Sequence, residues 1–138
     1  MSSDTAILWP IMAHVLLVFL LYALLSRRRA AAVREGSATV SQFRQNRDEP
    51  DESLFVRNSL ASQFELPVLF HVVCLLLFVT GADSLAAVAL AWIFVASRYV
   101  HAFVHVTSNR VRYRGRAFLL GFLTLAALWA WQAIWLTL

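Results

Sequence analysis

The sequence predicts an all-α integral membrane protein, a four-transmembrane-helix bundle whose helices run up and down through the bilayer. Three observations lead to this fold class. The chain is 60% hydrophobic and only 14% charged, which is too apolar for an ordinary soluble domain. It contains four long apolar segments, and most of its arginines gather in alternate connections between them. Such clustering is typical of loops that stay on the cytoplasmic side of a membrane.

The apolar segments predict helices at about 6–26, 52–80, 84–108 and 117–138. The first contains an uncharged run of 19 residues, 7–25, which is long enough to cross a bilayer. Three arginines follow this run directly, which is the reverse of the order in a signal peptide, so we expect the helix to be retained. The four helices together predict a single domain over residues 1–138.

The connections between the helices set the topology. The segment 27–50 is polar and rich in arginine, and we expect a loop there. The next helix is expected to begin just after Pro50, where Asp51, Glu52 and Ser53 are typical of a helix start. The sequence Gly81-Ala82-Asp83 predicts a tight turn, so the second and third helices are expected to be antiparallel neighbours.

Charge points to the lipid bilayer as a partner and away from nucleic acid. All twelve basic residues are arginine and the net charge is +4. Ten of the twelve lie in or next to two connections between apolar segments, where they are better explained by membrane topology than by nucleic-acid binding. We therefore expect loops 27–50 and 109–116 in the cytoplasm. Abundant alanine and arginine without lysine suggest a bacterial source, and so the bacterial inner membrane.

Glu65 and Arg98 lie inside apolar runs, where ionisable groups are costly and normally face the protein interior. Because the second helix enters and the third helix leaves on the same side, the two residues have similar depths. We predict an ion pair between them. The alternative is that this pair only fixes the register of the two helices and contacts no ligand.

The third predicted helix carries a polar stripe at spacings of three and four residues, formed by Arg98, His101, His105 and Asn109. His101 and His105 have the i, i+4 spacing that can hold a metal. His71 is the one further candidate ligand, and no carboxylate motif accompanies the pair. We therefore expect no metal, and we interpret the two histidines as polar lining of the helix bundle.

Four residues are candidates for contacts with an anionic ligand near the cytoplasmic surface. They are Arg57, Asn58, Tyr99 and Arg110. Arginine offers a fork of donors that matches a carboxylate, so this group suits a small molecule with carboxylates. For Arg110 and the arginines that follow it, the alternative is topology signalling and contact with lipid phosphates. For Arg112, Arg114 and Arg116 we favour that alternative.

The chain resembles the MAPEG family, the membrane-associated proteins in eicosanoid and glutathione metabolism. Its sequence is similar to a bacterial branch of that family. Three segments carry the resemblance: Gln63-Phe64-Glu65-Leu66-Pro67-Val68-Leu69-Phe70, Arg98-Tyr99-x-His101, and Asn109-Arg110-Val111-Arg112. The resemblance implies a homotrimer of four-helix protomers in which glutathione binds between protomers near the cytosolic face. It implies that an arginine stabilises the glutathione thiolate, which is the reactive form of a thiol.

Carried over to this chain, the resemblance implies that Arg57 and Tyr99 contact glutathione and that Arg110 stabilises the thiolate. Asn58, next to Arg57, is a further candidate for contact with this ligand. The chain departs from the family pattern in three places. Ala61 and Phe64 stand where the family has Asn and Glu, and Phe103 replaces a tyrosine. Glu65 lies one residue after the position of the family's Glu. One residue is a rotation of about 100° around a helix, so Glu65 cannot simply replace that Glu.

Two functions follow from these observations. The first is a glutathione-transferase-like conjugation of a hydrophobic small molecule that arrives from the lipid, with Arg110 as the catalytic residue. The second is a membrane protein without enzymatic activity that binds a lipid or small amphiphile or scaffolds a partner. The missing family residues favour the second function.

Overall fold

The computed structural model describes residues 5–138, and within them it contains six α-helices and no strands. The helices are α1 (Leu8–Arg34), α2 (Val40–Gln45), α3 (Asp51–Ser62), α4 (Leu66–Thr80), α5 (Leu85–Val106) and α6 (Val111–Thr137). Four segments are long and apolar enough to cross a membrane: α1, α3 with α4, α5, and α6. Residues 1–4 of the predicted single domain lie outside the described residues.

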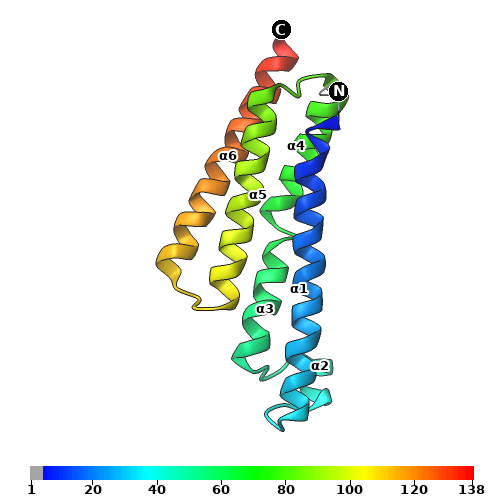
Figure 1. Cartoon of the computed structure of the whole chain (residues 1–138), viewed down its shortest axis with the longest axis vertical. Coiled ribbons are helices and arrows are strands. Elements are labelled where there is room, and N and C mark those ends of the chain that lie inside the picture. Colours follow the sequence, from blue (N-terminus) through cyan, green and yellow to red (C-terminus); the bar gives the residue numbers. More distant parts are fainter. Residues whose placement is uncertain (1–4) are drawn as a thin grey trace.

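The four segments alternate in direction, as predicted for an up-and-down bundle (Figure 1). The start of α1, the turn between α4 and α5, and the end of α6 share one end of the bundle, at the top of Figure 1. We call it the tryptophan-rich end, because Trp129, Trp131 and Trp135 lie in the last turns of α6. The opposite end carries α2 and the α5–α6 turn, and we call it the arginine-rich end.

The helix boundaries differ from the sequence-based prediction at the arginine-rich end. Helix α1 continues to Arg34, past the predicted end at 26, because its last turns are alanine and arginine, which are strong helix formers. The predicted loop 27–50 also contains α2, whose N-cap Thr39 forms a capping box with Gln42. Helix α6 begins at Val111 rather than at 117.

The predicted second helix is interrupted, and this break is the main correction to the fold. Helix α3 ends at Ser62 and α4 begins at Leu66. Pro67 has no backbone N–H and so cannot bond the carbonyl of residue 63, which stops the helix from running through. Glu65 precedes α4 with backbone angles φ −95° and ψ −108°, which are not helical.

The tight turn predicted at 81–83 is present. Gly81 ends α4 in the left-handed conformation, with φ 71°, which glycine adopts without a steric penalty. Ser84 then caps α5, because its hydroxyl accepts a hydrogen bond from the Ala87 N–H at 3.2 Å. The turn therefore reverses the direction of the chain, so that α4 and α5 run antiparallel.

Two apolar clusters form the core, one toward each end of the bundle. The first joins α4, α5 and α6 toward the tryptophan-rich end, where the rings of Phe70 and Phe94 stack with centroids 4.4 Å apart. The second joins α1, α3 and α5 toward the arginine-rich end through Leu17, Val56 and Leu60. The helix break in 63–65 lies between the α3 and α4 residues that belong to these clusters.

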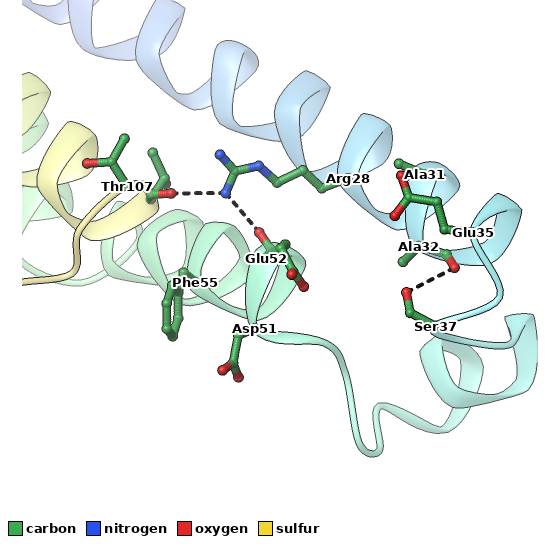
Figure 2. Close-up of a pocket in the computed structure, with 10 residues that line it drawn as sticks. Arg28, Ala31, Ala32, Glu35, Ser37, Asp51, Glu52, Phe55 and Thr107 are labelled. Carbon is green, nitrogen blue, oxygen red and sulfur yellow. Dashed lines mark hydrogen bonds between the residues drawn. The ribbon is translucent and has the colours of Figure 1, made fainter.

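Hydrogen bonds from long side chains tie the helices together at both ends. At the tryptophan-rich end, Trp131 Nε1 donates to the carbonyl of Ala82 at 2.9 Å, and Trp135 Nε1 donates to that of Thr80 at 3.0 Å. At the arginine-rich end, Arg28 Nη1 donates to the carbonyls of Glu52 at 2.8 Å and Val106 at 3.0 Å (Figure 2). Arg28 thereby joins α1, α3 and α5.

Candidate functional site

The helix break places a group of polar side chains inside the bundle, between the two apolar clusters. The Arg98 side chain lies there with only 2% of the residue exposed. Its Nη2 donates to the Ser62 hydroxyl at 2.9 Å, and its Nε donates to Gln63 Oε1 at 3.4 Å. Both acceptors come from the last turn of α3 and the residue that follows it. Arg98 is therefore held by neutral oxygen atoms.

The predicted ion pair between Glu65 and Arg98 is not formed. The salt bridges shorter than 4 Å within residues 5–138 both involve Glu49, with Arg29 and with Arg57. The helix break explains the difference, because residues 63–65 leave the helical path. Gln63 turns inward to Arg98, while Glu65 is exposed.

Two histidines extend this network toward α1 and α4. His14 Nε2 lies 2.9 Å from Gln63 Oε1, and His14 Nδ1 lies 2.9 Å from His71 Nε2. Gln63 Nε2 donates to the Ser59 carbonyl at 3.1 Å, which fixes Oε1 as the acceptor on the other side of the amide. His14 must then donate from Nε2 and accept at Nδ1, so its hydrogen-bonding capacity is fully used.

A cavity of about 510 Å³ opens beside Arg98, and we call it the polar cavity. It lies between α3, the helix break, α5 and the first turns of α6, which lean away from α3 toward the arginine-rich end (Figure 1). Its lining residues are Asn58, Ser62, Glu65, Leu66, Arg98, His101, His105, Val111, Arg114, Gly115 and Phe118. The helix break and the first turns of α6 thus form an opening on the side of the bundle toward the arginine-rich end.

The lining of the polar cavity carries two arginines against one carboxylate. Arg98 and Arg114 provide the positive charge, and Glu65 provides the negative charge. Arg114 Nη1 donates to Asn109 Oδ1 at 2.7 Å, which positions its guanidinium beside the start of α6. Each guanidinium has five N–H donors, so both keep donors beyond these contacts. The cavity is therefore suited to an anionic group such as a carboxylate.

Two further polar atoms in the cavity wall lack partners. His101 and His105 are buried, their ring centroids are 5.7 Å apart, and Nδ1 of each has no hydrogen-bond partner among the described residues. Leaving a buried polar atom unpaired costs about 1–3 kcal/mol. No cluster of three or more His, Cys, Asp or Glu side chains suited to a metal exists among residues 5–138.

The structure brings some of the predicted site residues together and separates others. Arg98, His101, His105, Glu65 and Asn58 all line the polar cavity, as the polar stripe on α5 indicates. The five residues therefore form one site within the chain, although Glu65 is not the direct partner of Arg98.

Arg57, Tyr99 and Arg110 do not converge within the single chain, and the resemblance places their glutathione contacts between protomers. Tyr99 is two residues from His101, about 200° around α5, and its hydroxyl donates to the Ala13 carbonyl at 2.6 Å. Arg110 is exposed at the N-cap of α6 and does not line the cavity. Arg57 turns toward the connection before α3, as described next.

Arg57 belongs to an ionic cluster at the arginine-rich end. It contacts Glu49 at 3.3 Å and donates to the Asn46 side chain, while Arg29 contacts Glu49 at 2.7 Å. Burial alone would raise the pKa of the Glu49 carboxyl. Hydrogen bonds from Arg29 and Ser53 and the charges of Arg29 and Arg57 outweigh burial and hold that pKa below its usual value. This cluster anchors the 27–50 connection to α1 and α3.

Six cavity residues were missed by the sequence-based prediction, namely Ser62, Leu66, Val111, Arg114, Gly115 and Phe118. Arg114 was interpreted as a topology or lipid contact, but it shares a face of α6 with Phe118, four residues later, opposite His101 and His105. Ser62 is likewise four residues after Asn58 on α3. Helical spacing is the signal that could have found both residues.

A larger hollow of about 670 Å³ lies at the arginine-rich end, between α1, α3 and the end of α5 (Figure 2). Arg28 lines it, but the guanidinium is bonded to two backbone carbonyls. The other charged residues around it are the exposed carboxylates Glu35, Asp51 and Glu52. We interpret this hollow as part of the structural link made by Arg28, because its polar groups do not converge on one point.

The fold and the polar cavity define a multi-pass α-helical membrane protein with a cationic site inside the bundle. The MAPEG family model matches residues 6–134 of the 138-residue chain, so the chain belongs to the MAPEG family. No curated protein and no solved structure matches the chain.

Proposed function

We propose that this protein binds glutathione in the polar cavity and conjugates its thiol with a hydrophobic substrate. The observation that carries the proposal is the pair of guanidinium groups of Arg98 and Arg114 beside one opening that His101 and His105 also line. Glutathione supplies carboxylates for the Arg98 guanidinium and a thiolate for the Arg114 guanidinium. Membership of the MAPEG family supports the same ligand class.

Arg114 is the residue we assign to the thiolate in this proposal, in place of Arg110. Arg114 lines the cavity and keeps free N–H donors, whereas Arg110 is exposed outside it. An unperturbed thiol has a pKa of about 8.5. A guanidinium that lowers it by about two units supplies roughly 2.7 kcal/mol of preference for the thiolate. The thiolate sulfur then bonds to an electrophilic carbon, and the displaced electron pair leaves with the substrate's leaving group.

The hydrophobic partner reaches this site from the lipid in the proposal. Leu66, Val111 and Phe118 form the apolar part of the cavity wall, and Phe118 lies beside His101 with ring centroids 6.4 Å apart. An apolar substrate would contact these side chains while the thiol stays near Arg114. We also propose a homotrimer, from the family. The arginine clusters and the composition add the proposal that it lies in a bacterial inner membrane with the arginine-rich end in the cytoplasm.

Binding and chemistry are tested separately. A ligand at one hundred times its dissociation constant adds about 2.7 kcal/mol to stability, so millimolar glutathione should raise the unfolding temperature of the purified protein in detergent. Arg114→Gln should lose both this shift and the conjugation of a chromogenic electrophile. The matched control Arg110→Gln removes the same charge outside the cavity and should behave as wild type.

If glutathione does not stabilise the protein, the second function becomes the better explanation, namely a non-enzymatic site for an amphiphile. The apolar wall at Leu66, Val111 and Phe118 is the observation that favours it. If glutathione leaves the unfolding temperature unchanged and a long-chain fatty acid raises it, the cavity binds an amphiphile and the conjugation proposal is wrong. If glutathione stabilises the protein but no electrophile is conjugated, only the chemical step is wrong.

A further inference from the structure

A second depression in the bundle lies between α5 and α6, and we call it the α5–α6 groove. It has a volume of about 430 Å³. Its lining residues are Ile93, Ala96, Ser97, Val100, Tyr113, Arg116, Ala117 and Leu120. None of these residues lines the polar cavity, so the two sites use different faces of the same two helices.

The groove is apolar along most of its length and polar at one end. Tyr113 and Arg116 belong to the first two turns of α6, so they mark the end of the groove that is nearest the arginine-rich end of the bundle. Ile93 and Leu120 lie toward the other end. On α5 the groove extends from Ile93 to Val100, which is about 10 Å at 1.5 Å per residue.

The two helices are held close together beside the groove. A Cβ atom on Gly121 would lie 2.6 Å from the Ser97 hydroxyl, a distance that only glycine permits. Ala96 and Ala117 have small side chains, which leave the depression open over this close contact. The groove is therefore a consequence of small residues at a tight helix crossing.

Arg116 has no ion-pair partner among the described residues. Its long side chain stands at the edge of an apolar surface within a membrane-spanning helix, where an anion at the membrane surface is its natural partner. Tyrosine is enriched at the same depth, because its ring is apolar and its hydroxyl is polar. The two residues together match the phosphate of a phospholipid, and the groove below them matches an acyl chain.

We propose that the α5–α6 groove binds one anionic phospholipid. One acyl chain occupies the apolar part between Ile93 and Leu120, and the phosphate accepts hydrogen bonds from the Arg116 guanidinium and the Tyr113 hydroxyl. The length of about 10 Å is a third of a hydrocarbon core of about 30 Å, so the bound chain stays within one leaflet. The lipid site is separate from the polar cavity and does not depend on glutathione binding.

The lipid site is tested with the full chain in mixed micelles that contain equal amounts of phosphatidylglycerol and phosphatidylcholine with the same acyl chains. Bound lipid is counted by native mass spectrometry. One basic residue contributes about 1 kcal/mol at an anionic surface, so wild type should retain the anionic lipid about fivefold more than the zwitterionic lipid. Arg116→Gln should remove most of this preference. Arg44→Gln, which removes a charge from α2, should keep it.

A second pair of variants tests the acyl-chain part of the groove. Ala96→Phe fills the groove and should lower retention of both lipids, whereas Ala86→Phe, an exposed position in the first turn of α5 outside the groove, should retain them. Equal retention by wild type and Ala96→Phe would overturn the proposal. If Ala96→Phe instead lowers the mass of the protein assembly, a second copy occupies the groove and the lipid site is wrong. Far-ultraviolet circular dichroism establishes that each variant is folded.

Discussion

Arg98 on α5 donates a hydrogen bond to the Ser62 hydroxyl on α3 at 2.9 Å, at the level where α3 ends. A charged group inside a membrane protein normally has a partner, and here that partner is neutral. The arrangement satisfies the guanidinium without cancelling its charge. Arg98 therefore contributes positive charge to the polar cavity, which it could not do if Glu65 neutralised it directly.

The contact of Arg98 with Ser62 predicts that Ser62 matters more for stability than Glu65 does. Ser62→Ala removes an acceptor from a charged donor and should lower the free energy of unfolding by about 1.5–3 kcal/mol. Glu65→Gln leaves this contact intact and should change the free energy of unfolding by less than about 0.5 kcal/mol. Thermal unfolding in detergent, followed by circular dichroism, measures both. A larger loss in Glu65→Gln than in Ser62→Ala would contradict this prediction.

The contact between His14 and Gln63 predicts an energetic coupling between α1 and the helix break. His14→Ala should lower stability by about 1–3 kcal/mol, because the buried Gln63 oxygen loses one of its two donors. A double-mutant cycle of His14→Ala with Gln63→Ala should show a coupling of at least about 0.5 kcal/mol. Strictly additive effects would mean that this hydrogen bond contributes nothing to stability.

The close contact of Gly121 with Ser97 predicts a size limit at the crossing of α5 and α6. Gly121→Ala should lower stability by about 1–3 kcal/mol, because the added methyl group overlaps the Ser97 hydroxyl. The next nearest atom lies at 3.6 Å, in ordinary contact, so Ser97→Ala in the same chain should restore most of the loss. Thermal unfolding of the three variants measures this. Gly115→Ala is the control, since no atom lies within 4 Å of its Cβ position.

The ionic cluster around Glu49 predicts a loss of stability in acid. The folded pKa of Glu49 is lower than the unfolded value, so its contribution is fully present above the unfolded pKa of about 4.3 and is lost as the pH falls through the folded pKa. The unfolding temperature of wild type should therefore fall more steeply below that pH than the temperature of Glu49→Gln does. Parallel curves for the two proteins across this window would show that Glu49 makes no such contribution.

The sequence by itself determined the four apolar segments and their up-and-down order. Apolar run length, the Gly81 turn and the arginine clusters depend on local chemistry and on the bilayer thickness, so they can be interpreted without a tertiary structure. The family was also accessible from local segments, and the family model covers nearly the whole chain. The spacing of three and four residues along the third predicted helix indicated that Arg98, His101 and His105 share a face, and these residues line one cavity.

Only the tertiary structure decided which polar groups meet. The break after Ser62 turns Gln63 inward and Glu65 outward, and a shift of one residue in such a segment is enough to exchange partners. The packing of α6 against α5 places Arg114 beside His101 and His105 in the cavity wall, while Arg110 lies outside it. Both outcomes depend on packing between helices that are distant in the sequence. The spacing of residues along one helix determines which side chains share a face of that helix. The packing of neighbouring helices determines what those side chains contact.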